Sequence, residues 1–305
     1  MSPIVESAIE RGLRLAAFSA ALALLVMTLF VFREGVPLLV RVSPQDFLLG
    51  QTWRPLQAQF GILPMLMGTT LVTLLALLIG VPVALACAIV QAELAPPRVR
   101  MLLKPLIELL ASVPSVVYGF LGLVSIVPWI RNHIGGPGTS ALAAAVVLSV
   151  MILPTICSVA TDALLAVPRT YREGALALGA TGWQTIYRVV LPAARPGVLA
   201  AIILGTGRAV GETMAVILVA GNAVALPHSV LDPVRTLTAH IALEMGYATG
   251  DHARSLFATG VVLFIAVMVL IIASHRLADA PMQRPQPWWR SILHRHSRAQ
   301  SGRSS

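Results

Sequence analysis

The chain has 305 residues; 57% of them are apolar and 11% are charged, and the mean hydropathy is +0.82. Soluble domains carry about twice that share of charged residues, so the composition excludes an ordinary soluble enzyme and predicts a membrane protein. The net charge is +9, but the basic tail, 276–305, is short and has no nucleic-acid-binding motif, and we expect no binding to nucleic acid.

The apolar runs predict six membrane-spanning α-helices. Crossing a hydrocarbon core of about 30 Å takes about 20 helical residues, and the alternating pattern of a membrane barrel is absent. In chain order the predicted spans are 15–32, 62–91, 104–130, 141–166, 197–220 and 256–275. The first is expected to stay uncleaved, because no small-residue cleavage site follows it before Arg33.

The predicted fold class is therefore an all-α membrane protein. Its organisation reads as an N-terminal segment with the first helix (1–32), an extracytoplasmic loop (33–61), a helical core (62–275) and a basic cytoplasmic tail (276–305). The two cysteines, Cys87 and Cys157, fall inside apolar runs, and we expect buried free thiols rather than a disulfide or a metal site.

The distribution of lysine and arginine predicts the orientation. If the N-terminus is cytoplasmic, 15 of the 22 cationic side chains fall on the inner side and 6 on the outer side, while Arg208 lies within a span. An excess of cations marks the cytoplasmic side. Both termini and the segment 167–196 are therefore expected in the cytoplasm.

The third predicted span contains a break. Pro114 removes a helix hydrogen bond, and Ser115, Tyr118 and Gly119 follow closely. These residues either line a polar path or form an ordinary kink with close helix packing. Glu108 lies four residues after Lys104, and pairing between the two is the simpler interpretation.

The segment 167–196 has the pattern of two short helices. Thr170 and Glu173 have the spacing of a capping box, which predicts a helix start near Tyr171. Gly179 is suited to ending that helix in a left-handed conformation. Thr181 could cap a second helix, which should end before Pro192. A compact structure of this kind favours docking to a soluble partner over a plain connection.

Two charged pairs lie four residues apart in helical segments. Arg208 and Glu212 are predicted on one face of the fifth span, where intramembrane charges either mark a transport path or form a structural ion pair. In the outer segment 221–255, HIALEM reads as a helix that carries His240 and Glu244. Two residues do not make a zinc site, and a re-entrant or interfacial helix is preferred.

The string EGALALGATGWQTIYRVVLP resembles the EAA loop of type I ABC importer permeases. Glu173, Ala175, Gly179, Leu191 and Pro192 match that pattern at fixed spacing; Gly174 and Val189 replace the usual alanine and isoleucine. FGILPMLMGTTLVT, ELLASVPSVVYGFLGL, GRAVGETMAV and TLTAHIALEMG resemble the phosphate-specific permeases of the PstC type. His240 stands where that family tends to have asparagine.

The resemblance implies a multi-pass inner-membrane subunit of a phosphate importer that works by alternating access. It implies a PstA-type permease, a cytoplasmic ATPase dimer and an extracytoplasmic phosphate-binding protein as partners, besides membrane lipid. The first helix of the EAA-like loop would be the coupling helix that meets the ATPase. The resemblance favours a place for Arg208 in the path of the anion, with Glu212 holding it in position. Ser115 and Tyr118 are further candidates for lining this path.

The chain contains no phosphate-binding loop of the form G-x4-G-K-[ST] and no catalytic motif. We therefore expect a non-enzymatic subunit with no cofactor or metal of its own, and ATP bound by the partner. The alternatives are the PstA-type subunit, a permease for another oxyanion, and an ion-coupled secondary transporter. The last usually shows internal repeats, and none is evident. A membrane enzyme ranks below these, because the catalytic motifs are missing.

Overall fold

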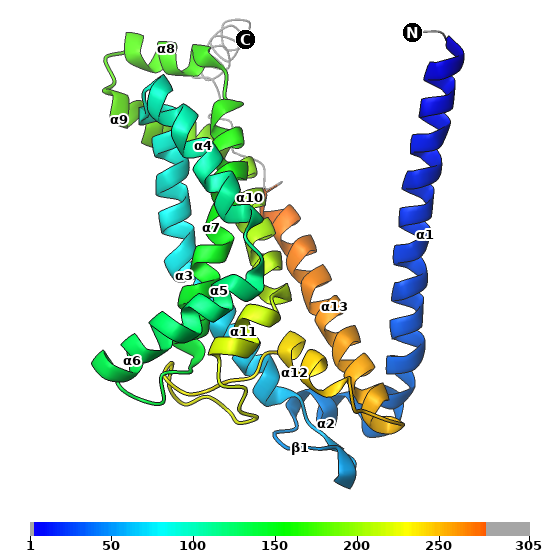
Figure 1. Ribbon diagram of the computed structural model, residues 1–305. Coiled ribbons are helices and arrows are strands. Elements are labelled where there is room, and N and C mark those ends of the chain that lie inside the picture. Colours follow the sequence, from blue (N-terminus) through cyan, green and yellow to red (C-terminus); the bar gives the residue numbers. More distant parts are fainter. Residues whose placement is uncertain (1–2, 279–305) are drawn as a thin grey trace, which may run out of the picture.

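The computed structural model describes residues 3–278, which form an all-helical bundle with one two-stranded hairpin (Figure 1). Six helical stretches in this part of the chain are long and apolar enough to span a membrane, which confirms the predicted number. They are Ile9–Val42, Leu63–Leu94, Ser115–His133, Ala141–Leu165, Gly182–Gly211 and Asp251–Ile272. Most of the basic tail lies outside the described residues.

Helix α3 (Leu63–Ile89) packs along α7 (Ala141–Leu165) and α10 (Leu191–Gly211) to form the core. The core is built from small side chains, with Ala76, Ala144 and Ala201 fully buried. Small residues allow helix backbones to approach closely, which is how membrane helices gain packing energy without a hydrophobic effect between them.

Helix α1 (Pro3–Val42) stands apart from this core and packs mainly against α13 (Asp251–Ala278) (Figure 1). The rings of Phe30 and Phe257 pack edge to face with centroids 5.5 Å apart. The segment expected as an outer loop, 33–61, is partly helical, because α1 continues to Val42 and α2 (Pro44–Leu49) follows.

The third predicted span, 104–130, is wrong as a single helix. The chain forms α4 (Pro97–Ser112), breaks, and continues as α5 (Ser115–Leu121), the π-helical η3 (Gly122–Ile126) and α6 (Val127–His133). The break follows from Pro114, because the residue before a proline is driven out of the helical region, and Val113 has ψ 128°.

The fifth predicted span, 197–220, is also interrupted. Helix α10 ends at Gly211, Glu212 is extended at φ −71° and ψ 129°, and α11 (Met214–Val219) begins two residues later. The span extends at its other end instead, through α9 (Gly182–Thr185) and the π-helical η4 (Ile186–Val190).

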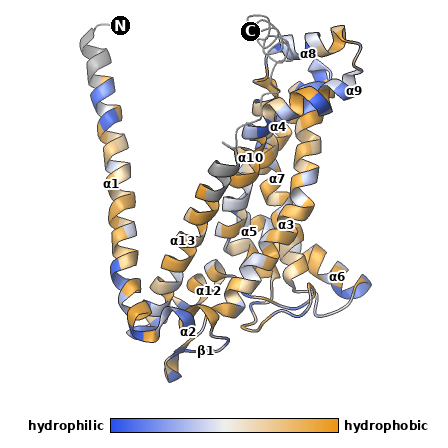
Figure 2. Cartoon of the chain, turned by 180° about the vertical axis from the view of Figure 1, so that it is seen from behind, coloured by the Kyte–Doolittle hydropathy of each residue, from blue (hydrophilic) through white to orange (hydrophobic). Residues whose placement is uncertain are grey.

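The two ends of the bundle differ in structure. The end with α8 (Arg169–Ala177), α9 and η2 (Val90–Leu94) is called the coupling end. The opposite end is called the hairpin end; it carries α2, β1 (Trp53–Arg54), η1 (Pro55–Gln57), β2 (Gln59–Phe60) and α12 (Leu237–Glu244). Hydropathy follows this division, with apolar spans between more polar ends, and α1 begins at the coupling end (Figure 2).

This arrangement gives a direct test of the predicted orientation. Thr181 at the coupling end and Thr249 at the hairpin end are both exposed. In a variant without Cys87 and Cys157, a cysteine at position 249 should react with a membrane-impermeant maleimide added to intact cells, and one at position 181 only after lysis. Labelling of 181 but not 249 in intact cells would reverse the orientation.

Candidate functional site

The coupling end projects a helix-turn-helix from the bundle. Helix α8 has no buried residue, and Leu176, Leu178 and Trp183 are exposed large apolar side chains. Glu173 is exposed as well. A cluster of apolar side chains outside the membrane-spanning core is typical of a protein interaction surface, so this segment has the features of a docking element.

Two expectations about this segment are confirmed. Gly179 follows α8 with φ +84°, and no atom lies within 4 Å of the position of a Cβ there, so backbone conformation rather than space favours glycine. Thr181 caps α9: its Oγ1 accepts from Gln184 N at 3.3 Å, and Gln184 Oε1 accepts from Thr181 N at 2.9 Å.

Two other expectations are wrong. Thr170 does not cap α8, because the helix already begins at Arg169, after the extended Pro168, and no side chain caps it. The second helix does not end before Pro192. It runs through η4 into α10, whose first turn contains this proline. The π-helical turn directly before Pro192 shifts the hydrogen-bond register there, which lets the helical stretch continue past the proline.

Arg172 joins α8 to two spans, and the sequence did not reveal it. Its Nε donates to Glu93 Oε1 at 3.2 Å and to Oε2 at 3.1 Å, its Nη1 donates to the carbonyl of Val167 at 2.7 Å, and its Nη2 donates to that of Leu164 at 2.9 Å. Glu93 lies in η2 and Leu164 at the end of α7. The hydrogen bond to Glu93 raises the pKa of Arg172, which keeps the guanidinium charged. We call this set of contacts the Arg172 joint.

Replacing Arg172 with glutamine should uncouple the docking segment from the spans. The change leaves the Glu93 carboxylate, whose side chain is 10% exposed, without its cation, and removing one partner of a buried pair is strongly destabilising. For the transport activity that the resemblance implies, we expect uptake to fall about tenfold or more, while the exposed α8 surface still binds the implied ATPase.

The matched control is Arg169→Gln. Arg169 is an exposed cation on the same helix, and it forms no ion pair within the described residues. Uptake and recovery of the partner subunit are measured on the same membranes. Wild-type uptake by Arg172→Gln would show that the joint does not transmit movement.

Arg208 lies near the end of α10 and points its guanidinium at α7. Its Nη1 donates to Thr155 Oγ1 at 3.3 Å, the single hydrogen bond that it makes within the described part of the chain. The Arg208 charge also acts on the phenol of Tyr118 in α5. A guanidinium has five N–H donors, so most of its hydrogen-bonding capacity remains available.

Glu212 does not share a helix face with Arg208, contrary to the expectation. The helix ends between them, and Glu212 Oε1 instead accepts from Ala215 N at 3.2 Å, which caps α11. Lys104 and Glu108 also form no ion pair within the described residues, although they line the same cavity. Arg208 and Glu212 do not pair as residues four apart in a helix would, because the helix is interrupted between them.

Tyr118 and Ser115 lie at the break between α4 and α5. The Tyr118 hydroxyl donates to the carbonyl of Leu110 at 2.7 Å. In a continuous helix that carbonyl would accept from residue 114, which is a proline without an N–H. Tyr118 therefore supplies the missing donor. Ser115 is the first residue of α5 and is half-buried.

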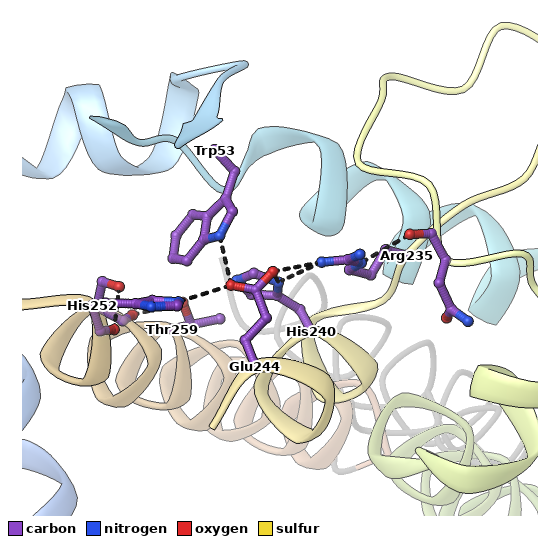
Figure 3. Close-up of polar contacts among 8 residues, drawn as sticks. Trp53, Arg235, His240, Glu244, His252 and Thr259 are labelled. Carbon is purple, nitrogen blue, oxygen red and sulfur yellow. Dashed lines mark hydrogen bonds and ion pairs between the residues drawn. The ribbon is translucent and has the colours of Figure 1, made fainter. Parts of the chain in front are cut away.

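At the hairpin end, one carboxylate holds four segments together (Figure 3). Glu244 Oε2 accepts from Trp53 Nε1 at 2.8 Å and contacts His252 Nε2 at 2.9 Å, and Glu244 Oε1 accepts from Arg235 Nη1 at 2.7 Å. His240 stacks edge to face on Trp53, with ring centroids 4.3 Å apart. We call these five residues the Glu244 cluster.

HIALEM forms a helix, as expected: His240 and Glu244 of the Glu244 cluster lie on α12. The described residues contain no group of three or more side chains placed to hold a metal ion. Helix α12 inserts beside α3, where Thr69 Oγ1 accepts from Leu237 N at 2.9 Å. Thr238 Oγ1 donates to the carbonyl of Glu212 at 2.9 Å. Through this bond the cluster reaches the break between α10 and α11.

The cluster should lose stability in acid. Burial lowers the pKa of His240 from 6.5 to about 4, so the folded protein keeps it neutral while the unfolded chain protonates it below pH 6.5. Burial acts to raise the pKa of Glu244, but hydrogen bonds from His252 and Trp53 and the nearby charges outweigh it and lower the pKa. Both shifts mean that the unfolded state binds more protons, so stability falls as pH decreases.

We therefore expect the melting temperature of the purified protein to fall between pH 6.5 and about 4, and less steeply for His240→Asn than for the wild type. His133→Asn is the control, because His133 is exposed at the same end. Thermal unfolding followed by tryptophan fluorescence measures the slope. If the melting temperature depends equally on pH in His240→Asn and in the wild type, His240 does not cause the loss of stability in acid.

Comparison with known proteins identifies the family. Residues 80–284 match the model of binding-protein-dependent transport system inner membrane components. The chain belongs to this family. A probable ABC transporter permease from Bacillus subtilis, YqgH, is 43% identical over 84% of this chain and 85% of its own length. The phosphate transport permease PstC of Xylella fastidiosa (strain 9a5c) is 39% identical over 75% of this chain and 77% of its own length.

Solved structures of ABC importers share the fold. A permease chain of the MetNI methionine transporter in an inward-facing conformation superposes with a TM-score of 0.55 and 25% identity, covering 75% of this chain and 99% of that one. A chain of a bacterial alginate importer gives a TM-score of 0.60 at 16% identity, over 92% and 99%. The family and the fold confirm a multi-pass inner-membrane protein of the type I ABC importer permease fold, and the predicted resemblance to PstC-type permeases.

Proposed function

We propose that this chain is the PstC-type subunit of an ATP-driven importer of inorganic phosphate, and that it moves the anion by alternating access. The observation that carries the proposal is Arg208, an arginine inside the bundle whose single hydrogen bond within the described residues leaves donors free. Arginine suits the binding of an oxyanion, and the PstC relatives from Pasteurella multocida and Xylella fastidiosa are named for phosphate transport.

The proposed partners follow from the two ends. The exposed α8–α9 surface would dock on a cytoplasmic ATPase dimer that binds and hydrolyses ATP, since this chain has no phosphate-binding loop. A PstA-type permease would complete the path. An extracytoplasmic phosphate-binding protein would deliver the anion to the hairpin end.

The proposed cycle uses the contacts of this chain. Closure of the ATPase dimer would move α8, and the Arg172 joint would pass that movement to α7 and η2. Helix α7 carries Thr155, the partner of Arg208. Movement of α7 would therefore change the surroundings of the guanidinium, in the way that alternating access requires.

The alternatives concern role and cargo. A PstA-type role or another oxyanion keeps the same architecture, and the permease from Bacillus subtilis is named without a substrate. An ion-coupled secondary transporter is disfavoured, because membership of a binding-protein-dependent family implies an ATPase and a binding protein.

Arg208→Gln should abolish uptake of radiolabelled phosphate while the complex stays assembled. Glutamine keeps some of the size of the side chain, but it removes the charge. The control is Arg195→Gln, which neutralises an exposed arginine on the same helix and should transport like wild type.

A role of Arg208 in the anion path and a purely structural role of Arg208 lead to different expected results. If Arg208 only fixed helix packing, Arg208→Gln would lower recovery of the complex together with uptake. Normal phosphate uptake by an assembled Arg208→Gln complex would rule out the path, and uptake of sulfate in preference to phosphate by the wild type would overturn the proposed substrate.

A further inference from the structure

A polar cavity of about 140 Å³ opens between α4, α7 and η2 at the coupling end. Helix α4 contributes Arg100, Lys104 and Glu108, which share a face because they are spaced four residues apart. Helix α7 contributes Ser158 and Asp162. With about 30 Å³ for each water in the liquid, the cavity has room for a few waters or one small anion.

Three residues that line this cavity, Gln91, Arg100 and Thr161, carry a buried side-chain polar atom with no hydrogen-bond partner within the described residues. Gln91 in η2 is 4% exposed, and its Nε2 has no hydrogen-bond partner within the described residues. The Nε of Arg100 is likewise buried and without an acceptor there, although its Nη2 donates to the carbonyl of Ala92 at 2.7 Å and so fixes the side chain. A buried donor without an acceptor is costly, so these two groups point to a ligand with acceptor oxygens.

The cavity also contains acceptors. Glu108 and Asp162 line it beside Lys104 and Arg100, and none of the four forms an ion pair with another described residue. A ligand that only accepts hydrogen bonds would leave both carboxylates unused. Inorganic phosphate at neutral pH carries at least one O–H, so it donates as well as accepts, whereas sulfate and a lipid phosphodiester only accept.

The cavity is aligned with Arg208 along one helix face. Thr155, the partner of Arg208, precedes Ser158 and Asp162 by three and seven residues, which places all three on the same side of α7. This polar stripe runs along an otherwise apolar span, from the guanidinium toward the coupling end. It provides a route by which an anion could leave Arg208.

We propose that this cavity is a second, inner phosphate site, where Gln91 and Arg100 donate to the anion and Asp162 or Glu108 accepts from its O–H group. The inference rests on the proposed function. The two cations and two carboxylates balance in charge, which favours weak binding. Weak binding suits a site of transit, because conduction requires that an ion can leave as well as enter.

Equilibrium dialysis tests the site with the assembled, nucleotide-free transporter without its binding protein. Radiolabelled phosphate should bind the wild type in preference to sulfate. Gln91→Leu, which keeps the volume but removes the donor, should weaken phosphate binding about tenfold. Asp162→Asn should reduce the preference over sulfate. Arg98→Gln, on the exposed face of α4 outside the cavity, should behave like wild type. All variants are compared at equal recovery of the complex.

Each outcome decides between the assignments. Unchanged phosphate binding by Gln91→Leu together with unchanged selectivity of Asp162→Asn overturns the inner site. Displacement of labelled phosphate by added anionic phospholipid vesicles as readily as by unlabelled phosphate would mean a lipid headgroup site, which also overturns it. If the wild type imports phosphate while these variants bind it normally, the inner site alone fails. If the wild type does not import phosphate, the proposed function itself fails.

Discussion

The hydrogen bonds between Arg172 and Glu93 determine where the coupling helix lies. Helix α8 buries no side chain of its own, so apolar packing cannot hold it in place. One guanidinium binds a carboxylate through Nε and binds two carbonyls at the end of α7. Its planar fork suits this multiple contact in a way that a lysine would not. The exposed surface of α8 is therefore held in a fixed position relative to η2 and α7. A displacement of α8 should displace these two elements as well.

The hairpin end depends on a comparable contact. Glu244 binds Trp53, Arg235 and His252, and α12 in turn binds the backbone of Glu212 through Thr238. The break at Glu212 follows Arg208 by four residues. In the proposed cycle, movement from the coupling end would reach Arg208 through α7, and movement from the hairpin end would reach it through α12. This convergence places the guanidinium where both ends of the protein can change its surroundings.

Local patterns in the sequence predicted much of the fold. The six spans, the positive φ of Gly179, the cap at Thr181 and the helix at 237–244 depend on neighbouring residues. The Arg172 joint and the Glu244 cluster could not be predicted in this way. Arg172 and Glu93 are 79 residues apart in the sequence, and Trp53 and Glu244 are 191 residues apart. The predicted pairing of Arg208 with Glu212 failed because a continuous helix was assumed through Gly211. Gly205 and Gly207 lie inside α10 without ending it, so the glycine at 211 did not distinguish this break from a continuous helix.

We infer that α8 moves as one body with η2 and the end of α7. Leu178 and Leu94 are both exposed and lie on the two sides of the Arg172 joint, so spin labels can replace them in the assembled transporter. Pulsed electron paramagnetic resonance then gives the distance between the labels with and without ATP. If α8 and η2 move together, we expect one narrow distance distribution that ATP leaves unchanged. A distance that shifts or broadens when ATP binds would show that α8 moves independently of the spans.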